Sequence, residues 1–340
     1  MTAGARLAAV PGRDEAVVAV AYGGICGSDL HYWKEGRIGE SVLRSPMVLG
    51  HEVVGIVAEP AANGSGPALG SRVAVHPARV CGACGLCRRG AEHLCADLRY
   101  LGSAARIPHT DGGFAERLVL PARRLVPVPD ALDMKTAALA EPASVALHGL
   151  DRVRELNRSV EGSDVLVIGS GPIGLLSVAM ACALGAATIT ATDVFDHPLR
   201  LAVRIGATHV VRVDAEAPVP VPVPSADIAI ESSGTPQGLA TALRSLRSGG
   251  VLVNVGHLPP IGVTAPLHLV VPRELTLMGS SRFYHEMPAA LEIMGRNIER
   301  FAPIVTSVFP LDDAESAFHE AAAAERSSKV LLSFPAAATS

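Results

Sequence analysis

Four cysteines lie within fifteen residues of the chain, as Cys81, Cys84, Cys87 and Cys95. Four soft thiolates at this spacing form a closed tetrahedral metal site, which leaves no position open for a substrate. Disulfides in a secreted protein are the alternative, but this density favours a metal site in a reducing compartment. The sequence therefore predicts a structural zinc ion that braces a loop, in a cytoplasmic protein.

A second set of candidate ligands, Cys26, His51, Glu52 and Glu141, is dispersed along the chain. One Cys, one His and one Glu provide three protein ligands and leave the fourth position of a zinc ion for a substrate oxygen. A lone Cys or His is more often a core residue, so the spacing alone leaves both interpretations open. Asp29 is the candidate partner that would orient His51.

A glycine-rich segment, Gly169-Ser170-Gly171-Pro172-Ile173-Gly174, follows the predicted strand DVLVI and opens a predicted helix. The three glycines allow a tight turn, a close approach of the backbone to a pyrophosphate, and close packing of helix on strand. An ordinary glycine-rich turn is the alternative, but the strand and helix on either side favour a dinucleotide site. Asp193 ends the next predicted strand, nineteen residues after Gly174. A carboxylate there would accept hydrogen bonds from ribose hydroxyls and repel a 2′-phosphate, which predicts NAD rather than NADP.

The elements that must position these residues fall into two regions of the chain with different sequence patterns. The first third of the chain consists of short apolar runs bounded by Gly, Pro and charged residues, which is typical of a β-rich, loop-rich domain. From about residue 163, apolar strands alternate with helical stretches, as in a doubly wound parallel sheet. After residue 283 we expect a helix near 287–297 and a strand–helix–strand ending in KVLLSF. The proline-rich segment 217–225 is predicted to be a surface loop.

Length and charge limit the function. The 340 residues suggest two domains, and the net charge of −4 provides no basic surplus for nucleic acid or for an anionic membrane. Residues 165–192 carry no charge and are long enough to cross a bilayer, but their glycines and proline favour a buried strand–helix–strand unit. We therefore expect a small-molecule partner, without a membrane or a nucleic acid.

Together these motifs resemble those of the zinc-containing medium-chain dehydrogenases, over nearly the whole chain. The strings that carry the resemblance are GGICGSDLHYW, PMVLGHEVVG, the four-cysteine segment, EPASVALH, GSGPIG and GSSRF. The chain looks most like the branch of sorbitol and L-idonate 5-dehydrogenases, and residues 99–114 and 279–287 look closer to the latter. The resemblance implies an α/β fold, with a GroES-like β-rich catalytic domain (1–142 and 283–340) and a Rossmann doubly wound domain (143–282).

The resemblance also implies roles for individual residues. Cys26, His51 and Glu141 would surround a catalytic zinc, which makes two zinc ions per chain, and Glu52 would ligate it in some states. The expected proton relay is Ser28 and His31. The residues expected near the substrate are Tyr32, Arg282 and Phe283, and those expected to contact the cofactor in addition to the glycine segment are Ile173, Val255 and Gly256.

The expected reaction is hydride transfer from a secondary hydroxyl to NAD, with zinc as the Lewis acid. L-Idonate, oxidised to 5-keto-D-gluconate, is the leading substrate; a neutral polyol such as sorbitol or xylitol is the alternative. A sugar-acid carboxylate would prefer a guanidinium or imidazolium partner, for which the candidates are Arg282, Arg99, Arg106 and His109. A non-catalytic protein that binds NAD or zinc is the alternative of another class. A homo-oligomer, dimer or tetramer, is expected by analogy.

Overall fold

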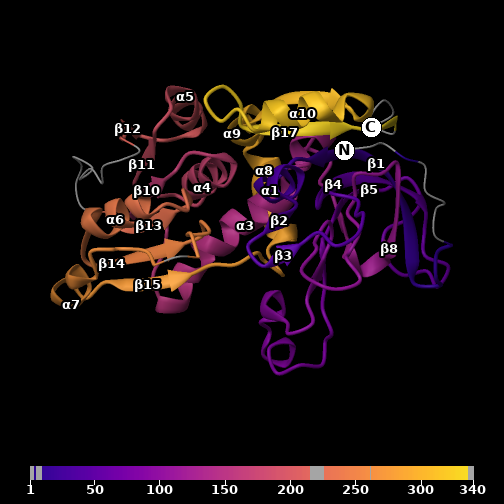
Figure 1. The fold of residues 1–340 in the computed structure, drawn as a ribbon, viewed down its shortest axis with the longest axis horizontal. Coiled ribbons are helices and arrows are strands. Elements are labelled where there is room, and N and C mark those ends of the chain that lie inside the picture. The colour runs from indigo at the N-terminus through magenta and orange to yellow at the C-terminus, as the bar shows by residue number, and fades with distance from the viewer. Residues whose placement is uncertain (1–3, 5–9, 215–225, 261, 336–340) are drawn as a thin grey trace.

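Two large β-sheets, one at each side of Figure 1, organise the chain. The computed structural model describes residues 4, 10–214, 226–260 and 262–335, so the predicted loop 217–225 lies outside the described residues. No helix within these ranges is both long enough and apolar enough to span a membrane. The limits 1–142 with 283–340, and 143–282, stay our proposed domain boundaries.

The first sheet has seven strands, in the order β16-β17-β1-β4-β5-β9, and β8 pairs with β1 beside this path. Strand β1 pairs antiparallel with β17, so segments from opposite ends of the chain share one sheet. The strands are β1 (Glu15–Gly24), β4 (Glu52–Glu59), β5 (Arg72–Val75), β8 (Arg117–Pro121), β9 (Leu125–Pro127), β16 (Val305–Pro310) and β17 (Lys329–Ser333).

The second sheet has six strands, all parallel, in the order β12-β11-β10-β13-β14-β15. The strand order reverses between β10 and β13, and ligands of such sheets bind at the carboxyl ends of the strands at this reversal. The predicted doubly wound sheet is confirmed. Its strands are β10 (Asp164–Ile168), β11 (Thr188–Asp193), β12 (His209–Arg212), β13 (Ala226–Glu231), β14 (Leu246–Asn254) and β15 (Thr276–Gly279).

The apolar runs of this sheet follow from burial on both faces. Alternate side chains of a strand point to opposite faces. In β10, Val165 and Val167 belong to one core cluster, which includes residues of α3, α4 and α5, whereas Leu166 and Ile168 belong to another, which includes residues of α6. Strands covered on both faces read as continuous apolar segments. The uncharged stretch 165–192 is thus a strand, a helix and a second strand.

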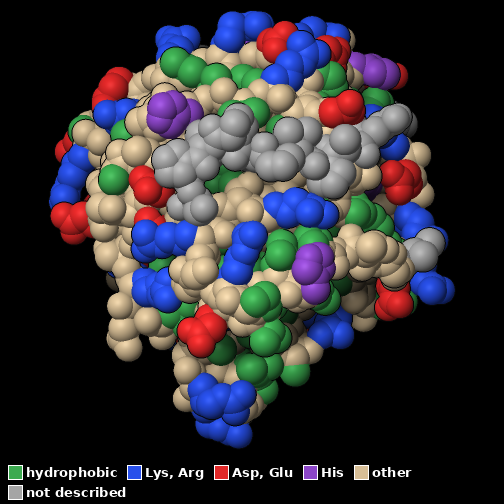
Figure 2. All heavy atoms as spheres, turned by 90° about the vertical axis from the view of Figure 1, so that its left-hand side faces the viewer, with side chains coloured by type: hydrophobic (Ala, Val, Ile, Leu, Met, Phe, Trp, Pro, Cys, Tyr) green, Lys and Arg blue, Asp and Glu red, His purple; other side chains and the backbone are tan. Residues whose placement is uncertain are grey.

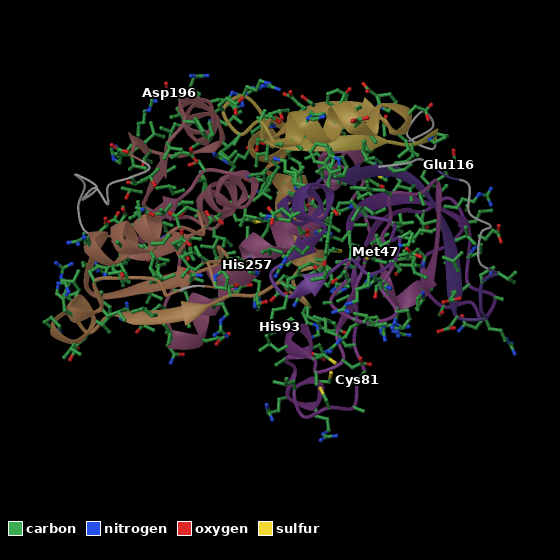
Figure 3. All side chains as sticks on the ribbon, in the orientation of Figure 1. Met47, Cys81, His93, Glu116, Asp196 and His257 are labelled. Atoms are coloured by element: carbon green, nitrogen blue, oxygen red, sulfur yellow. The ribbon has the colours of Figure 1, made fainter. Side chains whose placement is uncertain are left out.

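Helices and short strands complete the structure. The predicted late helix is α8 (Met287–Arg296), and the predicted strand–helix–strand is β16, α10 and β17. A lobe that carries Cys81 and His93 projects from the rest of the molecule at the bottom of Figure 3. The remaining elements are α1 (Gly27–Glu35), α2 (Met134–Ala137), α3 (Ala140–Asp151), α4 (Pro172–Ala183), α5 (Asp196–Ile205), α6 (Pro236–Ser245), α7 (Val270–Arg273), α9 (Ile298–Phe301), α10 (Ala314–Ala321), β2 (Arg37–Ile38), β3 (Ser41–Val42), β6 (Ala78–Arg79) and β7 (Arg99–Tyr100).

Figure 2 views the molecule from the side of the six-stranded sheet. Lys and Arg side chains are scattered there among Asp and Glu side chains. Both signs of charge therefore occur on this face.

Candidate metal and cofactor sites

Cys26, His51 and Glu52 meet where β1 ends and β4 begins. Their ligand atoms all lie within 4.8 Å of one another. The register of β1 against β4 places Gly24 opposite Glu52, and a Cβ atom at Gly24 would overlap the Glu52 carboxylate. A glycine is therefore required there for the acidic side chain to fit.

His51 is buried in a strongly anionic environment. Burial alone would lower the pKa of His51, but the facing Cys26 thiol and then Asp29 and Glu141 raise it well above its usual range. A metal cation bound among these groups would likewise be stabilised by their negative charges. The donor set of one thiol, one imidazole and nearby carboxylates suits zinc.

Glu141 reaches this site from α3. Its Oε1 accepts a 2.6 Å hydrogen bond from the Tyr100 hydroxyl, and burial raises the pKa of Glu141 even though His51 opposes the shift. The rings of Tyr100 and His51 are 5.7 Å apart. Glu141 thus borders the Cys26–His51–Glu52 group, while its orientation is fixed by a tyrosine that sequence reasoning missed.

Glu52 has a different partner. Both of its carboxylate oxygens lie 2.7 Å from Nζ of Lys329, and this ammonium also donates to the carbonyl oxygen of Ile25 at 3.1 Å. Both side chains are buried. Burial alone would lower the pKa of Lys329, but Glu52 and then Cys26 raise it. Sequence reasoning missed Lys329, although a lysine that opens the apolar strand KVLLS was a detectable signal.

Asp29 positions the backbone beside two candidate ligands. Its carboxylate accepts hydrogen bonds from N–H of Cys26 at 2.9 Å and from N–H of Gly50 at 3.0 Å. Gly50 has φ of 93°, in the left-handed region that favours glycine, and it directly precedes His51. Asp29 therefore holds the backbone at Cys26 and at Gly50, and its role in orienting His51 stays a prediction.

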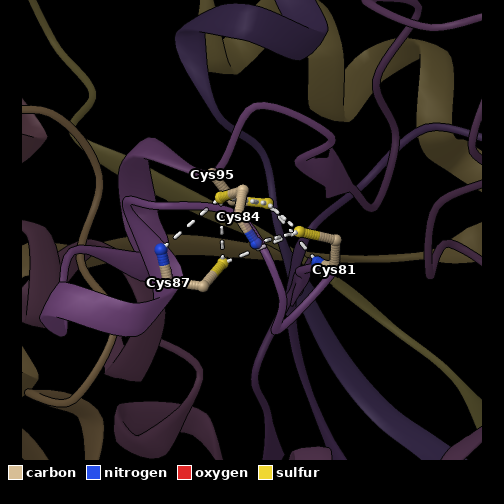
Figure 4. Close-up of side chains that lie close together, drawn as sticks. All are labelled: Cys81, Cys84, Cys87 and Cys95. Carbon is tan, nitrogen blue, oxygen red and sulfur yellow. Dashed lines mark hydrogen bonds between the residues drawn. The ribbon is translucent and has the colours of Figure 1, made fainter.

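The four cysteines Cys81, Cys84, Cys87 and Cys95 converge in the projecting lobe (Figure 4). Sulfur–sulfur distances within the cluster run from 3.5 to 4.0 Å. Ligands about 2.3 Å from a tetrahedral centre lie about 3.8 Å apart, so the cluster has the dimensions of a zinc site.

The pKa values of these thiols also indicate a site for a cation. Backbone N–H groups of Cys87 and Ala96 lower the pKa of Cys84 to about 6, whereas burial and neighbouring thiols raise the pKa of Cys87 to about 12. Four thiolates in contact cannot all ionise without a positive charge between them.

The glycine segment lies at the reversal point of the parallel sheet. Gly169 has φ of 83°, and a Cβ atom there would lie 2.8 Å from the backbone of Ser233. A Cβ atom at Gly174 would overlap the carbonyl oxygen of Gly169, so strand and helix approach closely, as predicted. At Gly171, which caps α4, a Cβ atom would meet no described atom within 4 Å. The helix N-terminus, with Pro172 and Ile173 in its first turn, is thus open to an anion.

Two acidic residues order the loops around this segment. Asp193 accepts hydrogen bonds from N–H of Ser170 at 2.8 Å and of Phe195 at 2.9 Å. Its four lone-pair sites leave acceptor capacity for ribose hydroxyls.

Glu231, which sequence reasoning missed, is fully buried at the end of β13. Its side chain accepts from N–H of Ser233, and its carbonyl oxygen accepts from N–H of Val255 and Gly256 at 2.8 and 2.9 Å. A glutamate that ends the apolar run ADIAI was its signal.

The predicted relay residues both lie on α1. Ser28 is half-buried, one turn before His31, which is exposed and whose Nδ1 lies 3.0 Å from Glu35. Tyr32, on the same helix, is buried, and its hydroxyl accepts a 3.0 Å hydrogen bond from N–H of Ala104. Tyr32 therefore fixes the loop around residue 104.

The residues expected near the substrate have different surroundings in the structure. The Arg282 guanidinium lies 5.2 Å from the centre of the Tyr100 ring, on a backbone with φ of 56°. A non-glycine residue in this region is strained by about 1–3 kcal/mol, and such residues cluster at functional sites. Phe283 is fully buried, with its ring centre 4.9 Å from that of His76, and both Arg282 and Phe283 stay candidates for substrate contact.

Two other cations proposed for a sugar acid lie elsewhere. Arg99 precedes Tyr100 in β7, and successive side chains of a strand point to opposite faces. Arg99 donates to the carbonyl oxygen of Pro108 at 3.0 Å. The Nε2 atom of His109 accepts from N–H of Arg44, and its Nδ1 donates to the carbonyl oxygen of Arg106. Both ring nitrogens of His109 are therefore engaged by backbone groups.

Comparison with known proteins places these sites in a family. The model of the alcohol dehydrogenase GroES-like domain matches residues 12–130, and that of the zinc-binding dehydrogenases matches residues 172–296. The chain is 35% identical over 320 residues to L-idonate 5-dehydrogenase (NAD(P)(+)) of Escherichia coli strain K12, covering 94% of this chain and 91% of that protein. It is also 35% identical over 315 residues to sorbitol dehydrogenase of Bacillus subtilis, covering 91% and 86%.

The fold agrees with this likeness. A crystal structure of L-idonate 5-dehydrogenase from Escherichia coli K-12 superposes with a TM-score of 0.86, at 34% sequence identity, over 95% of this chain and 92% of that one. The predicted combination of a GroES-like domain and a Rossmann sheet is thereby confirmed.

Proposed function

Because the chain belongs to the family of zinc-binding alcohol dehydrogenases, we propose that it oxidises the secondary hydroxyl of a sugar acid with NAD, and that L-idonate is its substrate. As a member of this family the chain is a zinc-dependent, NAD(P)-linked enzyme that acts on CH–OH groups. The observation that carries the proposal is the convergence of Cys26, His51 and Glu52, which Glu141 borders through its charge interaction with His51 and its hydrogen bond from Tyr100. Arg282 lies against the ring of that tyrosine.

In this proposal Cys26, His51 and Glu141 hold the catalytic zinc. Glu52 stays paired with Lys329, which satisfies both of its oxygens at 2.7 Å. When bound, zinc polarises the substrate hydroxyl and so favours loss of its proton. His51, Glu52 and Glu141 are buried and Cys26 is half-buried, and the exclusion of water strengthens the charge interactions among them.

The proton leaves through α1. Ser28 would accept this proton from the substrate hydroxyl while its own hydroxyl proton is released to the next group of the relay. His31 would deliver a proton to solvent, since its ring is exposed beside Glu35.

The cofactor would lie across the glycine segment. Gly171 would admit a pyrophosphate at the N-terminus of α4, and Asp193 would accept hydrogen bonds from the adenosine ribose, which favours NAD over NADP. Val255 and Gly256, whose N–H groups are held by the carbonyl oxygen of Glu231, would also contact the cofactor. NAD supplies the hydride acceptor, and the chain supplies its position.

Arg282 would bind the carboxylate of the sugar acid, because its guanidinium lies against Tyr100 beside Glu141. A neutral polyol such as sorbitol or xylitol is the second candidate, favoured by the equal identity to a sorbitol dehydrogenase. We further propose that the enzyme works as a cytoplasmic homo-oligomer, which size-exclusion chromatography with light scattering would test.

The test is NADH formation by the zinc-loaded protein, with L-idonate, D-gluconate, sorbitol and xylitol offered separately. Preferential turnover of L-idonate with NAD supports the proposal. Preference for sorbitol or xylitol would make the enzyme a polyol dehydrogenase instead. If the protein binds one zinc ion per chain and oxidises none of the four compounds, it is a non-catalytic member of the fold.

A further inference from the structure

A cavity of about 300 Å³ lies beside the short ribbon of β6 and β7. Three arginines, Arg79, Arg99 and Arg124, line it together with His109, Thr110 and Asp111. A volume of 300 Å³ lies at the lower limit of small-molecule sites.

The arginines are held together against their mutual repulsion. Arg79 and Arg99 are directly opposite each other in the antiparallel pair of β6 and β7, where like charges destabilise a ladder. Arg124 adds a third charge, and burial followed by the nearby Arg79 and Arg123 lowers its pKa to about 10. It cannot swing away without loss of two hydrogen bonds, to the carbonyl oxygens of His76 and Pro77 at 2.8 and 2.7 Å.

The charges that line the cavity are unbalanced. Three guanidinium groups face one carboxylate, that of Asp111, which leaves a surplus of two positive charges. Both ring nitrogens of His109 are engaged by the backbone of Arg44 and Arg106. Arginine stays protonated, so the surplus persists across the physiological pH range.

This cavity is separate from the metal site. Tyr100 points to Glu141, whereas Arg99, its neighbour in β7, points to the cavity. None of the described residues that line the cavity is a candidate ligand of the catalytic zinc or of the cysteine cluster.

We propose that this cavity binds the phosphate group of a small metabolite, at a second site behind the reaction centre. Guanidinium groups match phosphate oxygens in a bidentate manner, and three of them converge here. A bound dianion would cancel the surplus charge and relieve the repulsion between Arg79 and Arg99. Binding to the folded state alone then stabilises the protein in proportion to ln(1 + [L]/Kd).

The experiment uses the zinc-loaded protein saturated with NADH, so that the helix N-terminus of the nucleotide site is already occupied. The thermal midpoint and the heat of binding are measured with inorganic phosphate, with a sugar phosphate and with L-idonate, at constant ionic strength. Arg79→Gln and Arg99→Gln are the test variants, because each removes one facing charge while Arg124 keeps its backbone contacts. Arg204→Gln, which removes an exposed charge of α5, is the matched control.

We expect phosphate to raise the midpoint of the wild type and of Arg204→Gln, and the Kd to increase at least tenfold in both test variants. In phosphate-free buffer we also expect Arg79→Gln to melt higher than the wild type, since the repulsion is reduced; Arg99→Gln in addition loses the hydrogen bond to the carbonyl oxygen of Pro108. A sugar phosphate that binds more tightly than inorganic phosphate supports a metabolite site. Equal responses of all four proteins, or binding of L-idonate in place of phosphate, would overturn the proposal.

Discussion

The ammonium of Lys329 lies 2.7 Å from both carboxylate oxygens of Glu52, a residue 277 positions earlier in the chain. Both side chains are almost fully buried. Removal of one member of such a pair leaves an uncompensated buried charge, which costs about 3–5 kcal/mol. We therefore expect Lys329→Met to reduce the free energy of unfolding by this amount, measured by urea denaturation.

A double-mutant cycle checks the cause. Lys329→Met combined with Glu52→Gln should be less destabilised than the sum of the single variants, because neither charge is then left alone. Strictly additive effects would mean that the pair is not coupled, and Glu52 would then be free to serve as a metal ligand.

The zinc content should distinguish the two metal sites. We expect two zinc ions per chain in the wild type and one in each of Cys26→Ser and Cys84→Ser, measured by elemental analysis. Turnover should disappear in Cys26→Ser, whereas Cys84→Ser should mainly lower thermal stability, because its site has no open position. Cys182→Ser, in α4, is the control and should keep both ions. Two ions in Cys26→Ser would refute our ligand assignment.

Cofactor choice should depend on Asp193. In Asp193→Ser the carboxylate that would repel a 2′-phosphate is lost, so we expect the ratio of kcat/KM for NADP to that for NAD to rise at least tenfold, about 1.4 kcal/mol. Asp196→Ser removes an exposed carboxylate three residues later and should leave the ratio unchanged. If both variants keep the wild-type ratio, Asp193 only orders the glycine loop.

Substrate choice should depend on Arg282. If its guanidinium binds a carboxylate, Arg282→Gln should lower kcat/KM for L-idonate by about ten- to a hundredfold, the value of a hydrogen bond to a charged group. The kcat/KM for sorbitol should change far less. Arg296→Gln, at an exposed position of α8, is the control. Equal losses for both substrates would instead assign Arg282 a structural role through its contact with Tyr100.

Stability should fall in mild acid because of His76. Its Nε2 faces the carbonyl oxygen of Tyr284 and its Nδ1 accepts from N–H of Ala78, and burial lowers its pKa to about 4. Between pH 6.5 and 4 the unfolded chain therefore binds a proton that the folded chain does not. Unfolding free energy should drop by about 1–2 kcal/mol between pH 7 and 5 from this group.

His76→Gln isolates this effect, since glutamine does not titrate. The difference in unfolding free energy between wild type and variant should shift by this amount between pH 7 and 5. A difference that is independent of pH would show that His76 titrates alike in both states.

Local signals were sufficient for the parts of the structure that short segments determine. The cysteine cluster and the glycine segment each lie within one loop or turn, so their residue types and spacing alone predicted their chemistry. The alternation of strands and helices likewise predicted the parallel sheet. A strand that is buried on both faces, such as β10, requires apolar residues at successive positions, and this continuous apolar segment is visible in the sequence.

Long-range contacts were not predictable in this way. Lys329 meets Glu52 only because β17 pairs with β1, and no local pattern encodes that register. The contact of Arg282 with the Tyr100 ring likewise joins residues that are far apart in the chain. Phe283 was expected near the substrate on the basis of family resemblance; its ring is buried in the core, and its contact with a substrate stays a prediction.

The participation of β17 in the sheet of β1 has a consequence for the order of events during biosynthesis. The four candidate residues of the catalytic metal site, Cys26, His51, Glu52 and Glu141, are all translated in the first half of the chain. The cation that compensates Glu52 is translated only at position 329. A nascent chain on the ribosome therefore carries every candidate ligand long before it can bury them. We expect metal to be secured in this site only after translation has passed β17, and a message truncated shortly before that strand to yield a product unable to retain it.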